Sequence, residues 1–103
     1  MKTISDSVYT PRLALIRETM KKKKIDGFLV TDITNIHYLT GFSGSSGFLF
    51  ITGKEHFFST DFRYRDQSEH EVKGWDIVIE RGNRIQTIQN LCKKTGAKNL
   101  GFE

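Results

Sequence analysis

The sequence has a single cysteine, Cys92, and no apolar run near the roughly 20 residues that a membrane-spanning helix requires. One cysteine excludes an internal disulfide and fits a reducing compartment. The residues behind Lys2 are not apolar, so no secretory signal is visible. These absences predict a cytoplasmic protein without a membrane segment. Cys92 lies in a stretch with helical apolar spacing and is expected to pack against neighbours rather than to react.

The chain also lacks a second basic cluster. Lys and Arg number 16 against 12 Asp and Glu, and the net charge of +4 comes largely from the four lysines at positions 21–24. A nucleic-acid-binding surface would need a broader basic track, whereas lysines at the end of a helix complement its dipole while staying solvated. We therefore expect no nucleic-acid partner.

Three segments show the apolar spacing or end signals of helices. Thr10 and Pro11 are typical of a helix start, with Thr10 as the cap, and Asp26 with Gly27 would stop that helix. Residues 64–71 are charged and compatible with a helix. Residues 83–94 place Ile85, Ile88 and Cys92 on one face, with Asn83 as a cap and Gly96 as the end.

Apolar runs predict the strands, at residues 28–31, 47–52, 56–61, 75–80 and from 100 onward. The runs at 47–52 and 56–61 are separated by a short glycine-containing loop and should form an antiparallel hairpin. Because both are nearly continuous in apolar character, helices should cover both of their faces. Residues 32–40 are expected to form a loop with a short helical turn. The pattern predicts one α/β domain over residues 1–103, a mixed parallel and antiparallel sheet with helices on both faces.

The last strand signal is cut short at Glu103, which suggests a piece of a longer protein.

Residues 41–47, GFSGSSG, are the compositionally unusual stretch and could bind a phosphate or carry a nucleophile. A phosphate-binding loop needs a lysine after its last glycine and then a helix, but Gly47 is followed by Phe48 and a strand. A nucleophile elbow needs glycine where Ser45 stands. His37, His56 and His70 have no spacing that selects one of them as a base. The loop is therefore interpreted as a turn into the hairpin.

Metal ligation has equally little support. The acidic and histidine side chains Asp61, Asp66, His70 and Glu71 lack a recognised spacing for zinc or for a dinuclear centre. From the residues alone, no self-sufficient active site and no cofactor are predicted in this chain.

Three motifs nevertheless form an ordered set: NIHYLTGF at 35–42, SGSSG at 43–47, and STDFRY at 59–64 with Gln67 close behind. Together they resemble the amino-terminal domain of the creatinase, prolidase and aminopeptidase P family, and the resemblance extends from the Arg12 helix to the GFE ending. Phe62 stands where glycine is common in that family, and His37 occupies a position that the family varies.

The resemblance implies a ribonuclease H-like fold and a parent enzyme that cleaves the bond before proline. It implies two divalent metal ions, manganese or cobalt, held by a carboxy-terminal "pita-bread" catalytic domain that is absent from this chain. It further implies a homodimer, contact with the catalytic domain, and short proline-containing peptides as substrates. The amino-terminal domain would restrict access to the active site. Two alternatives stay open: a creatinase-type amidinohydrolase, and a non-enzymatic protein- or peptide-binding module of the same fold.

Four side chains are candidates for contact with substrate or with the dimer partner: His37, Phe42, Arg63 and Tyr64. The alternative for Phe42 is a place in the core and for His37 simple exposure. Arg63 could bind a peptide carboxylate through two hydrogen bonds. Alternatively, it pairs with Asp61 and fixes the corner between the hairpin and the following helix.

Overall fold

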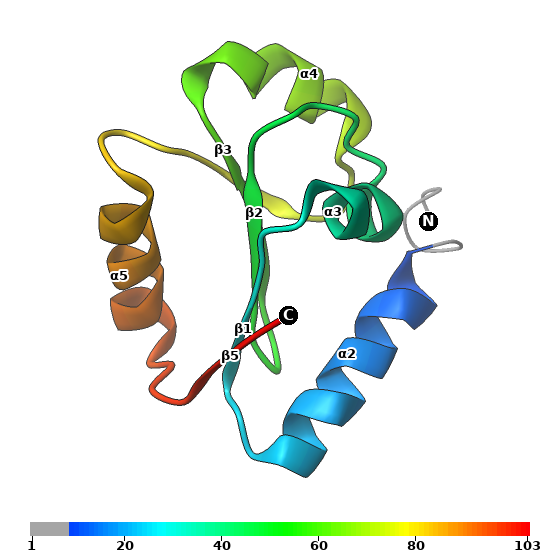
Figure 1. The fold of residues 1–103 in the computed structure, drawn as a ribbon, viewed down its shortest axis with the longest axis vertical. Coiled ribbons are helices and arrows are strands. Elements are labelled where there is room, and N and C mark those ends of the chain that lie inside the picture. The colour runs from blue at the N-terminus through cyan, green and yellow to red at the C-terminus, as the bar shows by residue number, and fades with distance from the viewer. Residues whose placement is uncertain (1–8) are drawn as a thin grey trace.

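The computed structural model of the protein describes residues 9–103, and Figure 1 shows helices alternating with strands along this part of the chain. The elements in order are α2 (Thr10–Lys23), β1 (Gly27–Val30), α3 (Ile33–Thr40), β2 (Phe48–Ile51), β3 (His56–Thr60), the 3₁₀ helix η1 (Phe62–Tyr64), α4 (Arg65–Glu71), β4 (Asp76–Ile79), α5 (Arg84–Thr95) and β5 (Leu100–Phe102).

The five strands form one mixed sheet in the order β4-β3-β2-β1-β5. Strands β2 and β3 form the expected antiparallel hairpin, in which Phe48 lies opposite Ser59 and Ile51 opposite His56. Strand β1 is antiparallel to β2. Strand β4 pairs in parallel with β3 at one edge of the sheet, and β5 pairs in parallel with β1 at the other. The predicted mixed sheet is confirmed.

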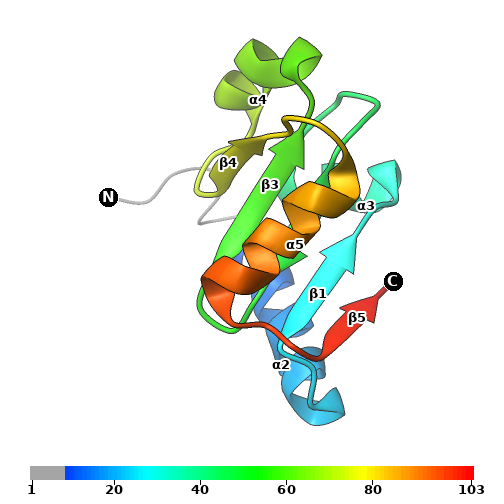
Figure 2. The same ribbon diagram turned by 90° about the vertical axis from the view of Figure 1, so that its left-hand side faces the viewer.

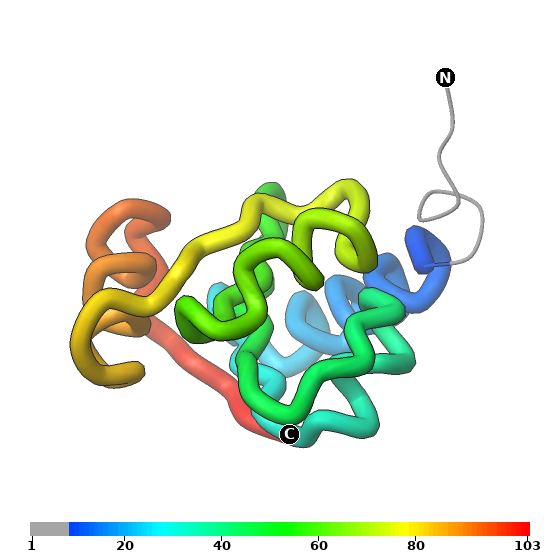
Figure 3. The backbone as a smooth tube through the Cα atoms, turned by 90° about the horizontal axis from the view of Figure 1, so that it is seen from above, coloured from blue at the N-terminus to red at the C-terminus, as the bar shows by residue number. Residues whose placement is uncertain are grey.

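Apolar side chains are buried on both faces of the sheet, which explains why the β2 and β3 runs are nearly continuous. Helices α2 and α3 cover one face and α5 covers the other, as Figures 1 and 3 show, while α4 lies beyond the carboxyl end of β3 (Figure 2). The first cluster consists of Leu13, Met20, Val30, Ile36, Leu39, Phe42, Leu49, Ile51, Phe58, Val72 and Trp75. The second, beneath α5, consists of Leu29, Phe48, Phe50, Phe57 and Leu91, with Cys92 packed against it. The packing role expected for Cys92 is confirmed.

The ends of α2 differ from the prediction. Thr10 is already helical, and the N-cap is Tyr9, whose side chain makes no capping hydrogen bond. At the other end the helix stops at Lys23, because Lys24 adopts a left-handed conformation with φ of 58°. Gly27 therefore does not end the helix. It starts β1, where a Cβ atom would lie 2.6 Å from the Leu100 side chain, so a larger residue would have to displace that side chain.

Residues 33–40 form a full helix where a loop with one helical turn was expected. The Asp32 carboxylate accepts hydrogen bonds from the backbone amides of Thr34 and Asn35 and caps α3. Gly41, with φ of 83°, ends it.

In α5, Asn83 caps the Gln86 amide at 2.7 Å and Gly96 ends the helix, as predicted. The predicted apolar face is wrong at Ile85, which is 67% exposed, because the buried face is centred on Thr87 and Leu91.

Candidate functional site

The loop at residues 41–47 wraps around the Phe42 ring. This ring is fully buried and contacts Phe58 and Tyr64 edge-on, with ring centroids 4.7 and 5.6 Å away. A Cβ atom at Gly44 would lie 2.3 Å from Phe42 Cζ, so a glycine is needed for the loop to close over the ring. Phe42 therefore serves packing, the alternative considered for it, and its side chain has no surface left to touch a partner.

Glu71, at the end of α4, anchors the same loop. Its carboxylate accepts a hydrogen bond from the Ser43 amide at 2.8 Å and one from Ser43 Oγ at 2.9 Å. Gln67 Nε2 donates to Ser43 Oγ at 3.0 Å and also reaches the carboxylate. Burial by itself raises the pKa of Glu71, but the hydrogen bonds from Ser43 and Gln67 outweigh it and lower the pKa below its ordinary value. The carboxylate thus stays ionised and holds the loop against α4.

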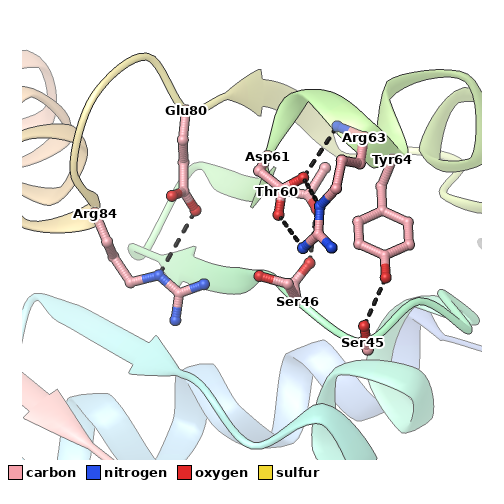
Figure 4. Close-up of polar contacts among 8 residues, drawn as sticks. All are labelled: Ser45, Ser46, Thr60, Asp61, Arg63, Tyr64, Glu80 and Arg84. Atoms are coloured by element: carbon pink, nitrogen blue, oxygen red, sulfur yellow. Dashed lines mark hydrogen bonds and ion pairs between the residues drawn. The ribbon is translucent and has the colours of Figure 1, made fainter.

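Arg63 and Asp61 form the corner between β3 and α4 (Figure 4). The guanidinium donates from Nε and Nη2 to the two carboxylate oxygens, each at 2.9 Å, in a bidentate pair. Asp61 also caps η1 by accepting from the Arg63 amide at 3.0 Å. The hydrogen bonds from Arg63 lower the pKa of Asp61 to about 2. The alternative in which Arg63 pairs with Asp61 is therefore the one that the structure adopts.

Two further hydrogen bonds connect this corner to the serines of the loop (Figure 4). Thr60 Oγ1 donates to the Ser46 carbonyl at 2.6 Å, and the Tyr64 hydroxyl lies 2.6 Å from Ser45 Oγ. The bond with Ser45 lowers the pKa of Tyr64. Every serine of the SGSSG stretch thus forms a hydrogen bond with a residue of η1, of α4 or of the end of β3. These bonds fix the stretch as an ordered turn.

His37 lies on the exposed side of α3, and its Nδ1 donates to the Phe42 carbonyl at 3.0 Å. The structure brings Phe42 and Tyr64 into contact and sets Arg63 beside Tyr64, with the Arg63 guanidinium 5.1 Å from the Tyr64 ring centroid. Contacts of His37, Arg63 and Tyr64 with a substrate or a second subunit stay a prediction.

Several anchoring residues were missed by sequence reasoning. Glu103 accepts hydrogen bonds from the amides of Thr31 and Asp32, and from Asn35 Nδ2 at 2.8 Å, so it holds the start of α3. These partners are distant in sequence and no local signal reveals them. Sequence reasoning also missed the pair formed by Glu80 and Arg84, which lie 3.6 Å apart at the end of β4 (Figure 4).

Within residues 9–103 there is no group of three or more His, Cys, Asp or Glu side chains that could hold a metal ion. Asp61, Glu71 and His70 instead make protein hydrogen bonds to Arg63, Ser43 and the Asp66 carbonyl. In the same part of the chain, no helix combines the length and the apolar character needed to cross a membrane.

The sequence of this chain is similar to that of a known domain family and of known peptidases. Residues 12–103 match the model of the creatinase/prolidase N-terminal domain. The chain is 42% identical over 92 residues to the uncharacterized peptidase YqhT of Bacillus subtilis (strain 168), covering 89% of this chain and 26% of that protein.

Two solved structures are similar in fold and in sequence. The Xaa-Pro dipeptidase from Bacillus anthracis superposes with a TM-score of 0.87 at 32% identity, over 92% of this chain and 27% of that one. An Xaa-Pro aminopeptidase from Streptococcus pyogenes gives a TM-score of 0.85 at 34% identity, over 94% of this chain and 74% of that one. The chain thus spans only about a quarter of YqhT and of the B. anthracis dipeptidase. The ordered motifs, the sheet and these matches lead to one conclusion: the chain belongs to the creatinase/prolidase N-terminal domain family.

Proposed function

We propose that residues 1–103 form the non-catalytic amino-terminal domain of a longer, metal-dependent peptidase that hydrolyses the bond before proline. The observation that carries the proposal is the family match over residues 12–103, combined with relatives that extend far beyond the matched part. The described residues do not fit a dinuclear metal centre, because their carboxylates and histidines are not gathered as ligands. The two divalent ions, manganese or cobalt, belong in this proposal to the domain that follows.

The role proposed for this domain is to restrict access to the active site and to contribute to a homodimer in the cytoplasm. The 41–47 loop suits this role because Glu71, Thr60 and Tyr64 fix it to three other elements. A loop held in this way can present neighbouring side chains without a large cost in conformational entropy. His37, Arg63 and Tyr64 are the side chains proposed to border the substrate entrance or the second subunit.

The test is a substrate comparison with the full-length protein. We expect hydrolysis of Xaa-Pro dipeptides or of longer Xaa-Pro peptides in the presence of manganese, with loss of turnover when a chelator removes the metal. Turnover of creatine with no turnover of proline peptides would instead indicate the amidinohydrolase. The absence of both activities, together with peptide binding by a metal-free protein, would indicate the binding module.

A further inference from the structure

A small pocket lies between α2 and the amino ends of β3 and β4. Its volume is about 250 Å³, and its lining includes Leu13, Arg17, His56, Lys73, Gly74 and Trp75. None of the described residues that line it is acidic. The pocket is at the opposite end of β3 from the corner formed by Asp61 and Arg63, so it is separate from the site described above.

Arg17 brings a half-buried positive charge to this pocket. Its Nε donates to the Thr52 carbonyl at 2.8 Å. Its Nη2 donates to the Glu55 carbonyl at 3.0 Å and to His56 Nδ1 at 3.1 Å. All three acceptors are neutral, and among residues 9–103 Arg17 forms no ion pair. Because charges withdrawn from water are normally paired, the guanidinium lacks the anionic partner that its position calls for.

Lys73 adds a second cation from the loop that precedes β4. Its Nζ donates to the Glu69 carbonyl, in the last turn of α4, at 2.8 Å. Within the described part of the chain, Lys73 also forms no ion pair. An ammonium group has further N–H donors, so Lys73 can keep this bond and donate to an anion in the pocket as well.

His56 makes the charge of the pocket depend on pH. Its Nε2 donates to the Gly74 carbonyl at 2.7 Å, so in the neutral ring Nδ1 is the atom that accepts from Arg17. The charged groups around the ring are Arg17 from α2, Asp76 from β4 and Lys73 from the loop. Protonation of Nδ1 would set an N–H group against the Arg17 cation. An anion in the pocket would offset that repulsion, so anion binding and protonation should favour each other by the same factor.

We propose that this pocket binds a doubly charged oxyanion of the phosphate class, either free phosphate or the phosphate group of a small phosphomonoester. Arg17 and Lys73 would donate to its oxygens, and His56 would add a third donor when protonated. Charge-assisted bonds of this kind are strong, and a dianion, unlike a carboxylate, would neutralise both fixed cations. The inference goes beyond the proposed function and does not depend on peptidase activity.

The test follows the His56 ring by NMR in the full-length protein. Sulfate is the probe because it keeps both of its charges throughout the titration, and the loss of a resonance in His56→Gln assigns the ring. Replacing chloride by sulfate at equal ionic strength should raise the pKa of His56 by about half a unit, which corresponds to about threefold tighter binding by the protonated protein. His70 is the internal control, because it is exposed and its Nδ1 also bonds to a backbone carbonyl. Its pKa should be the same in both salts.

Lys73→Gln tests the donor set without disturbing the core, since Lys73 is exposed and its Nζ bonds to a backbone carbonyl. This variant should lose at least half of the sulfate effect on His56. Lys98→Gln is the matched control. It removes the same charge from an exposed lysine just before β5, at the opposite edge of the sheet from β4, and should keep the whole effect.

Equal pKa values of His56 in sulfate and in chloride would overturn the proposal. An equal shift at His70, or a shift that survives Lys73→Gln, would also overturn it, because the effect would then be general to the ions. Acetate that matched sulfate would contradict the preference for a dianion. Inorganic phosphate and methyl phosphate distinguish the two sources, since the anion with the larger shift is the better ligand. A sulfate effect without proline-peptide hydrolysis would refute the proposed function alone.

Discussion

Position 44 is the place where a single side chain would disturb the loop most directly. A Cβ atom there would overlap the buried Phe42 ring, with 2.3 Å to Cζ and 2.7 Å to Cε2. The ring cannot yield easily because Phe58 and Tyr64 pack against it.

We expect Gly44→Ala to lower the free energy of unfolding by about 1–3 kcal/mol, the usual cost of overpacking. Gly53→Ala is the matched control, because a Cβ there has no neighbour within 4 Å, and it should change stability by less than about 0.5 kcal/mol. Urea unfolding curves provide the comparison. Equal midpoints for the two variants would show that the ring moves aside.

His56 should make stability depend on pH. Its Nε2 donates to the Gly74 carbonyl at 2.7 Å, and its Nδ1 accepts from Arg17 at 3.1 Å, so the native ring is neutral. Burial first, and then the charge of Arg17, lower the pKa of His56 below its ordinary 6.5, although the Gly74 bond and Asp76 oppose the shift. Because the unfolded chain binds the proton first, stability is complete above pH 6.5 and is lost as the pH falls toward the native pKa.

His56→Gln should therefore lose less stability than the wild type between pH 7.5 and 5.5, as measured by urea unfolding at each pH. The glutamine keeps a donor and an acceptor but has no proton to gain. An identical loss in both proteins would assign the acid sensitivity to another group.

His37 is the side chain for which a role in substrate selection can be separated from folding. It is exposed, and its bond to the Phe42 carbonyl is of the kind that contributes about 1 kcal/mol. If the full-length protein has the proposed peptidase activity, we expect His37→Ala to change the ratio of kcat/KM between dipeptides and longer peptides severalfold, with little change in Tm.

His70→Ala is the control, because His70 is also exposed and its Nδ1 also bonds to a backbone carbonyl at 3.0 Å. It should leave the ratio unchanged. Unaltered kinetics of His37→Ala with a lowered Tm would assign His37 a structural role only.

Among the helices and strands, those marked by turn or capping residues close in the sequence could be predicted. Those that are stabilised by residues far away in the sequence could not. The β2–β3 hairpin and α5 were predictable because Gly53, Asn83 and Gly96 mark their turns and ends. Helix α3 was predicted as a loop with a single helical turn, because part of its stabilisation comes from Glu103, whose bond to the Thr31 amide spans 72 residues. The apolar face of α5 was misplaced because Ile85 lies two residues before Thr87, about 200° away around the helix, and so faces away from the sheet that Thr87 and Leu91 meet.

The distant anchor of α3 can be tested through Glu103→Gln. A neutral amide accepts more weakly than the carboxylate does, so the first turn of α3 should lose about 1 kcal/mol of local stability. Hydrogen exchange at Thr31 and Asp32 should then become roughly fivefold faster, the factor that corresponds to this energy. Glu69→Gln, a change at an exposed glutamate of α4, is the control. Equal exchange in both variants would show that the Asp32 cap suffices.

At the scale of the whole molecule, the sequence predicted the class of fold and the presence of helices on both faces of the sheet. This was possible because strands that are buried on both faces, such as β2 and β3, have continuous apolar runs. The family was recognisable from the order of three motifs, each of which is weak alone. The network of hydrogen bonds that fixes the 41–47 loop could not be recognised from the sequence. Its central contact, between Ser43 and Glu71, joins residues 28 positions apart through common polar types, and only the folded chain brings them together.

The central claim is that this chain is a domain without catalytic groups of its own in a proline-specific metallopeptidase. The most direct measurement assays purified residues 1–103 and the full-length protein side by side on an Xaa-Pro dipeptide with added manganese. We predict turnover by the full-length protein alone. Turnover by residues 1–103 that persists after contaminating peptidases are removed would contradict the account, as would a full-length protein that hydrolyses no proline peptide.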